Sequence, residues 1–178
     1  VLISLDDYFV DREKTPRDAD GNYDYEALEA IDLGLFNDHL CRLMRGESVD
    51  IPRYDFITGR RTWHKNPLTL DERSILIVEG IHGLNPRLTP SVPEAQKFRI
   101  YISCFTSVSM DNLSRIATTD NRLLRRMVRD NATRGHNAQA TLARWESVRR
   151  GEEKHIFPYQ ENADVMFNSS LFYEISVL

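Results

Sequence analysis

Two short segments suited to buried strands each end in an acidic residue. LISL is followed by Asp6, and ILIV is followed by Glu79. In parallel α/β sheets, ligands bind beyond the carboxyl ends of the strands, so two carboxylates there can share a divalent metal, or one can act as a base. Mg²⁺ takes only one or two protein carboxylates and leaves its other positions to water and phosphate. The alternative is that both acids simply face solvent.

The segment NRLLRRMVRDNATRG is rich in arginine. It contains Arg122, Arg125, Arg126, Arg129 and Arg134, with Asp130 as its one acid. On a helix, the first four arginines share one face, because they recur at i, i+3/i+4 and i+7. Guanidinium groups match phosphate oxygens bidentately and stabilise a phosphoryl group during transfer. A solvated basic face and a nucleic-acid-binding helix are the alternatives. The second is disfavoured because the chain is acidic overall and the segment has no interleaved aromatic residues.

A third feature is PRYDF, where Tyr54 and Phe56 lie on the same face of an expected strand. Aromatic side chains at a sheet edge can stack on a base or a sugar, and the alternative is ordinary packing. The five histidines show no metal-ligand spacing. We therefore expect them to have structural or surface roles.

The elements that must position these residues alternate between strands and helices. Strands are expected at 1–4, 74–80, 98–103 and 163–167, with 74–80 the clearest buried one, and a hairpin at 49–63 turning at Thr58-Gly59. Helices are expected from the Asp32 cap to Gly46, within 109–134, and from the Asn137 cap to near Gly151. This order predicts an α/β fold with a largely parallel sheet.

Length and composition predict one globular domain, residues 1–178, and neither a transmembrane helix nor a signal segment is expected. The two cysteines, Cys41 and Cys104, are far apart in sequence and fit a reducing cytoplasm. The net charge of −4 conceals an asymmetry. Residues 1–32 carry ten acids and three bases, whereas residues 115–150 carry nine arginines and three acids. The first segment suits metal or proton chemistry, and the second suits anion binding.

The order of the motifs is more specific than any one of them. SLDDYF, YDYE, IPRYDF, ILIVEGIHGLN, RLLRRMVRD, TRG and FPYQENADV together resemble the uridine kinase / phosphoribulokinase family of P-loop kinases over nearly the whole chain. The chain is most similar to uridine-kinase-like regions at the C-terminal end of longer bacterial proteins. The resemblance implies a three-layer, P-loop NTPase-like α/β fold of the nucleoside kinase type. It also implies that residues 109–151 form a helical, arginine-rich lid.

The resemblance also implies roles for individual residues. Asp6 would be the catalytic base and lie near Mg²⁺, and Glu79 would be the second metal-associated acid. Asp24 would bind the ribose hydroxyls, and Tyr54 and Phe56 would lie beside the nucleoside. The arginines would bind phosphate or substrate from the lid: Arg122, Arg125, Arg126, Arg129 and Arg134.

Three departures from the family pattern qualify these expectations. A family tyrosine is Phe9 here, and Gly59 replaces a histidine that reads the pyrimidine, which puts uridine specificity in doubt. No GxxxxGK[ST] motif occurs, so the first strand and its phosphate-binding loop are expected to be missing from a fragment of the parent protein. An interior strand cannot be lost without leaving ladder hydrogen bonds unpaired. The isolated chain is therefore expected to have negligible kinase activity.

The expected activity of the parent protein is ATP- and Mg²⁺-dependent phosphorylation of a nucleoside 5′-hydroxyl, of the uridine or cytidine type, in the cytoplasm. A sugar phosphate or a pantothenate-like alcohol is an alternative acceptor. A non-catalytic nucleotide-binding or RNA-binding module is an alternative of another class. No membrane or nucleic-acid partner is expected, and a homo-oligomer remains an open alternative.

Overall fold

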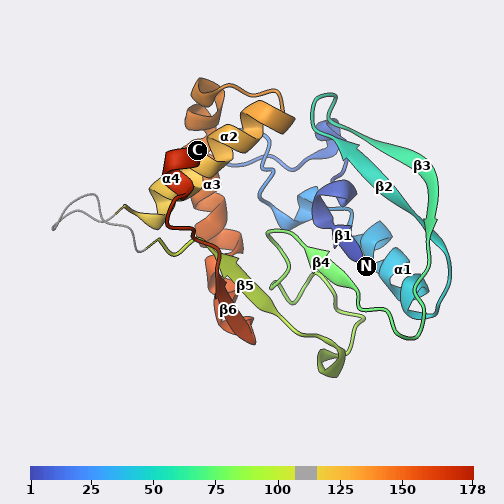
Figure 1. Ribbon diagram of the computed structural model, residues 1–178. Coiled ribbons are helices and arrows are strands. Elements are labelled where there is room, and N and C mark those ends of the chain that lie inside the picture. The colour runs from blue at the N-terminus through green and yellow to red at the C-terminus, as the bar shows by residue number, and fades with distance from the viewer. Residues whose placement is uncertain (107–115) are drawn as a thin grey trace.

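Figure 1 shows the computed structural model of the chain, which describes residues 1–106 and 116–178. The described elements lie in two groups. Strands β1 and β4, helix α1 and the β2–β3 hairpin lie on one side, and strands β5 and β6 with helices α2, α3 and α4 lie on the other (Figure 1). Parallel strand pairs flanked by helices confirm the predicted α/β class.

The first group is built around the parallel pair of β1 (Leu2–Ser4) and β4 (Ile77–Glu79). Ile3 and Leu5 belong to the same buried core as Phe36 and Leu40 of α1 (Leu33–Met44). The Asp32 carboxylate caps α1 as predicted, accepting a hydrogen bond from the Leu35 N–H at 3.0 Å. This packing fixes the carboxyl ends of β1 and β4 side by side, because Ser4 pairs with Glu79.

The predicted hairpin is present and longer than expected. Strand β2 (Val49–Asp55) runs antiparallel to β3 (Arg60–Leu68), and the turn lies at residues 56–59. The Asp55 carboxylate accepts hydrogen bonds from the Ile57 N–H and the Thr58 hydroxyl, both at 2.8 Å. Gly59 closes the turn at φ +71°, a left-handed conformation that favours glycine.

The second group contains the parallel strands β5 (Ile100–Ser103) and β6 (Val165–Asn168). Helices α2 (Thr118–Thr133) and α3 (Ala138–His155) pack together. We call them the lid helices, after the lid that the family resemblance leads us to expect. The Asn137 side chain caps α3 as predicted, at 2.9 Å from the Ala140 N–H. The expected start of the arginine-rich helix at 109 lies outside the described residues. The short helix α4 (Glu174–Val177) ends the chain.

The predicted end of α3 near Gly151 is wrong, since the helix continues to His155. Gly151 adopts no left-handed conformation and instead lets α3 approach Glu26 closely. The segment between β1 and Asp24 contains short 3₁₀ turns. The 3₁₀ turns of the described chain are Leu5–Tyr8, Arg12–Lys14, Leu28–Ala30, Glu94–Gln96 and Phe157–Asn162.

The described strands form three separate two-stranded sheets. The expectation that residues 74–80 are buried is wrong, because the side chains of Ile75 and Ile77 are 76% and 55% exposed. Strand β4 pairs with β1 on one edge only, and β5 pairs only with β6, so no described strand joins β4 to β5. Apolar side chains on both of these strands therefore face open space. No helix in the described part of the chain is long and apolar enough to span a membrane.

His82, in the segment after β4, has a buried ring whose two nitrogens lack a hydrogen-bond partner of good geometry among the described residues. Its side chain is 1% exposed, and its ring lies 5.9 Å from that of His155. Burial, and to a smaller extent the neighbouring His155, lower the pKa of His82 to about 4, against smaller opposing effects of the Ala27 backbone, Glu29 and Asp24. The folded protein therefore favours the neutral ring.

This lowered pKa predicts a loss of stability on acidification. An unfolded histidine takes up its proton near pH 6.5 and the folded His82 does not, so stability present above pH 6.5 falls as the pH drops toward 4. We expect a slope of about 1.4 kcal/mol per pH unit from this group, measured by urea unfolding between pH 6.5 and 5. His82→Gln should remove the contribution of His82 to this slope of the unfolding free energy against pH. His64→Gln, at an exposed position, should leave the slope unchanged. Equal slopes in both variants would contradict the assignment.

Candidate active site

Asp6 and Glu79 line one cavity of about 1540 Å³ that also extends between β4 and β5. The parallel register of β1 and β4 brings the two acids to the same edge. Arg134, which follows α2 in the turn between the lid helices, reaches across to them, and its Nη2 donates to Asp6 Oδ2 at 3.0 Å. The strand-end acids and the arginine-rich segment therefore meet, although they are 128 residues apart in sequence.

The surroundings of Asp6 shift its protonation. Burial is the largest effect and raises the pKa of Asp6 above its usual 3.8, and the charge of Glu79 raises it further. Arg134, Arg129 and Arg126 lower it, but the net direction is upward. A carboxylate with a raised pKa is a stronger proton acceptor, so Asp6 is suited to act as a general base.

Three aromatic side chains form a wall of the cavity beside Asp6, and we call them the aromatic wall: Phe9, Tyr54 and Phe56. The ring centroids of Tyr54 and Phe56 lie 5.2 Å apart, and Phe9 lies 5.5 Å from Tyr54. The Arg134 guanidinium lies 4.1 Å from the centre of the Phe56 ring. A flat ring or sugar can stack on such a surface while its polar end meets Asp6.

The other predicted arginines divide between two environments. Arg122, Arg126 and Arg129 line the cavity with Arg134. Each is held by an acid: Arg122 by Glu152 at 2.5 Å, Arg126 by Asp130 at 3.4 Å and Arg129 by Asp130 at 3.1 Å. Arg125 does not line this cavity and instead pairs with Glu174 and donates to the Ser169 carbonyl at 2.7 Å. Asp130 and Glu152 thus order most of the arginine face.

Asp24, like Arg125, is a predicted site residue that does not line the cavity. Its carboxylate accepts a hydrogen bond from the Glu26 N–H at 3.2 Å, and its neighbours Tyr23, Tyr25 and Glu26 line the cavity in its place. Asp24 therefore orders the segment that contributes these three side chains. A direct contact with a bound ligand would need a rearrangement of this segment.

Glu26 and Arg12 are among the cavity residues that were not predicted as site residues from the sequence. Glu26 is half-buried beneath Arg126, 3.6 Å away, and its partial removal from solvent raises its pKa despite that arginine. Arg12 donates from Nη2 to the Phe56 carbonyl at 2.7 Å. Glu26 is the last residue of the YDYE motif, which could have marked it, whereas no motif or spacing marks Arg12.

The residues present fit a magnesium ion in the way that this ion prefers. The described residues contain no group of three or more His, Cys, Asp or Glu side chains that could enclose a metal. Mg²⁺ needs only one or two carboxylates when phosphate and water complete its shell. Asp6 and Glu79 supply that number at one edge of the cavity, and the Glu79 side chain has no hydrogen bond or ion pair with the described residues.

An α/β fold in which strand-end acids face two arginine-rich helices is the arrangement expected of a P-loop NTPase-like fold. The sequence profile of the Phosphoribulokinase / Uridine kinase family matches residues 3–175, and the chain belongs to this family. The chain is 28% identical to a uridine kinase of Saccharomyces cerevisiae, over 95% of the chain and 31% of that protein. It is 26% identical to a uridine kinase of Halobacterium salinarum and 29% identical to one of Vibrio vulnificus. Each alignment covers 93% of the chain, but only 66% and 70% of those two proteins.

Proposed function

We propose that the protein containing this chain transfers the γ-phosphoryl group of ATP to the 5′-hydroxyl of a nucleoside. The observation that carries the proposal is Asp6, held between Glu79 and Arg134 beside the aromatic wall. Membership of the kinase family and the relatives called uridine kinases support the reaction class and the acceptor. The relatives are partly covered, so the activity of the whole protein is inferred.

In this proposal Asp6 orients the acceptor hydroxyl and accepts its proton. The hydroxyl oxygen forms a bond to the γ-phosphorus, the bond from that phosphorus to the β,γ-bridging oxygen breaks, and ADP leaves. Arg134 must release Asp6 and turn to the transferring group, where Arg122, Arg126 and Arg129 also face the cavity. In this proposal Arg125 also binds a phosphate group, after it has released Glu174. Such reactions depend mainly on positioning and electrostatic stabilisation.

Asp6 and Glu79 would hold Mg²⁺, which supplies charge neutralisation for the phosphate oxygens when bound. The chain has no GxxxxGK[ST] motif, so the triphosphate would be bound by a further strand and phosphate-binding loop that lie between β4 and β5. The unpaired edges of these strands and their exposed apolar side chains support this arrangement. The rival class, a non-catalytic module that lost its nucleotide grip, predicts that no such loop exists in the full-length protein.

The proposal is tested by incubating the full-length protein with ATP, Mg²⁺ and a panel of nucleosides, with a sugar phosphate and pantothenate as alternative acceptors. We expect monophosphate formation from at least one nucleoside. Asp24→Asn should raise KM for the nucleoside about tenfold or more if Asp24 binds the ribose hydroxyls, since hydrogen bonds to charged groups contribute about 1.5–3 kcal/mol. Exclusive turnover of a non-nucleoside would reassign the acceptor. No turnover of any acceptor would favour the binding-module alternative.

A further inference from the structure

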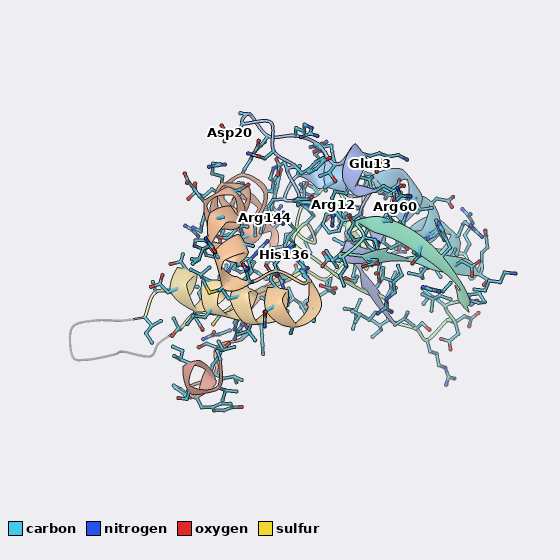
Figure 2. All side chains as sticks on the ribbon, turned by 90° about the horizontal axis from the view of Figure 1, so that it is seen from above. Arg12, Glu13, Asp20, Arg60, His136 and Arg144 are labelled. Carbon is cyan, nitrogen blue, oxygen red and sulfur yellow. The ribbon has the colours of Figure 1, made fainter. Side chains whose placement is uncertain are left out.

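Two arginines and a histidine that line the cavity have no part in the reaction proposed above. Arg12 belongs to the 3₁₀ turn Arg12–Lys14, His136 to the turn between the lid helices, and Arg144 to α3. All three line the same cavity. In Figure 2 they lie along the boundary between the lid helices and the hairpin, with Arg60 and Glu13 farther out on the hairpin side.

The backbone of the hairpin turn holds Arg12 in place. The Arg12 N–H donates to the Gly59 carbonyl at 2.9 Å, and Arg12 Nη2 donates to the Phe56 carbonyl at 2.7 Å. A Cβ atom on Gly59 would lie 2.5 Å from Arg12 Nε and 2.6 Å from its Cζ. The guanidinium therefore fills the space above Gly59, at the end of the aromatic wall.

The charges of Arg12 and Arg144 are not neutralised. Within the described residues, no carboxylate lies within 4.0 Å of either guanidinium, whereas Arg150 pairs with Asp18 and Asp20 on the same cavity. Asp55, whose pKa Arg12 helps to lower, lies beyond that distance. The Arg144 guanidinium lies 5.7 Å from the centre of the Tyr25 ring. Two arginines thus present unpaired charge to one end of the cavity.

The pKa of His136 reflects its burial and the positive electrostatic potential of these arginines. Burial lowers the pKa of His136, and Arg144, Arg12 and Arg134 lower it further, with Asp130 opposing them. Cations from three elements therefore surround a ring that can itself gain a proton. An anion placed among them would gain from all of these charges and would favour protonation of the ring.

We infer that Arg12, His136 and Arg144 form a subsite for a carboxylate or phosphate group on the acceptor, at the end away from the reacting hydroxyl. The inference rests on the proposed phosphoryl transfer at Asp6 and narrows the acceptor to an anionic alcohol or nucleoside. Arg134 connects Asp6, at the reacting end of the cavity, with the aromatic wall, because it pairs with Asp6 and lies over the Phe56 ring. Arg12 in turn donates a hydrogen bond to the Phe56 carbonyl. An acceptor lying along the aromatic wall with its hydroxyl at Asp6 therefore ends at Arg12. Arginine offers only donors, so that end must carry acceptor atoms, and the unpaired charge selects an anion.

The first test compares the affinities of matched nucleosides for the full-length protein by calorimetry. Uridine is compared with orotidine, which carries a carboxylate on its ring, and with uridine 3′-monophosphate, which carries a phosphate on its sugar. We expect one of these two anionic compounds to bind about tenfold or more tightly than uridine. Comparing them shows whether the subsite binds the carboxylate or the phosphate. Arg12→Gln and Arg144→Gln should each remove most of this preference. Arg60→Gln is the matched control, because Arg60 pairs with Glu13 at an exposed position.

The second test follows the protonation of His136 by NMR during a titration with inorganic phosphate. Phosphate should raise the pKa of His136 in the wild type, and much less in Arg144→Gln, which leaves the hydrogen bonds of Arg12 intact. Uridine binding as tightly as both anionic nucleosides, or a preference unchanged in Arg12→Gln and Arg144→Gln, would overturn the subsite.

The two proposals fail in different ways. A phosphate-dependent shift of His136 without turnover of any acceptor would remove the phosphoryl transfer and keep the anion subsite. Turnover of neutral nucleosides in preference to anionic ones, equal in the wild type and Arg12→Gln, would remove the subsite and keep the phosphoryl transfer.

Discussion

Asp6→Asn is expected to lower kcat/KM for phosphoryl transfer by about three orders of magnitude in the full-length protein, because general-base catalysis contributes about 10²–10⁴-fold. Asparagine keeps the size of the side chain but accepts no proton at neutral pH and binds Mg²⁺ more weakly. It also removes the charge that holds Arg134 at 3.0 Å. The measurement is steady-state formation of the phosphorylated nucleoside from ATP, with folding checked by thermal unfolding.

The adjacent acid provides a matched control for this substitution. The Asp7 carboxylate accepts the Tyr54 N–H at 3.2 Å and supports the hairpin, and Asp7 does not line the cavity. Asp7→Asn keeps an oxygen that can accept this hydrogen bond, so kcat should change less than about threefold, as expected for one neutral hydrogen bond kept in place. A similar loss of activity in both variants would mean that Asp6 acts through structure and is not the base.

The strand-end acids could be predicted from sequence because their position depends on local patterns. A short apolar run that ends in an acid places that acid at a strand terminus, and a parallel sheet brings such termini to one edge. Asp6 and Glu79 were predicted in this way, and the arginines of α2 were predicted from their helical spacing. The caps of α1 and α3 are also local, since Asp32 and Asn137 each bind an N–H three residues ahead.

The features that could not be predicted depend on the partner that each surface meets. The apolar run of residues 75–78 predicts burial, yet Ile75 and Ile77 are exposed because no described strand pairs with the second edge of β4. Gly151 has the sequence signature of a helix end, but its position in the packing makes it a contact site within α3. The sequence gives no sign of the burial of Glu26, which depends on the close approach of that helix.

Gly151→Ala is expected to destabilise the protein by about 1–2 kcal/mol, although alanine is the better helix former. A Cβ at Gly151 would lie 2.4 Å from Cβ and 2.6 Å from Cγ of Glu26. These atoms are next to the Glu26 backbone, so a rotamer change cannot relieve the clash, and α3 or the segment around Glu26 must move. Since Glu26 also lies 3.6 Å from Arg126, the movement disturbs the arginine face of the lid helices.

Gly34→Ala in α1 is the matched control and should have the opposite sign. A Cβ at Gly34 would meet only the Asp32 side chain, at 3.7 Å, which is ordinary contact. The substitution should therefore stabilise the protein by about 0.5–1 kcal/mol, because alanine loses less backbone entropy than glycine on folding. Urea unfolding at pH 7 measures both changes on one scale. If Gly151→Ala were as stabilising as Gly34→Ala, the close packing of α3 on Glu26 would be wrong, and Glu26 would no longer explain how Arg126 is held at the cavity.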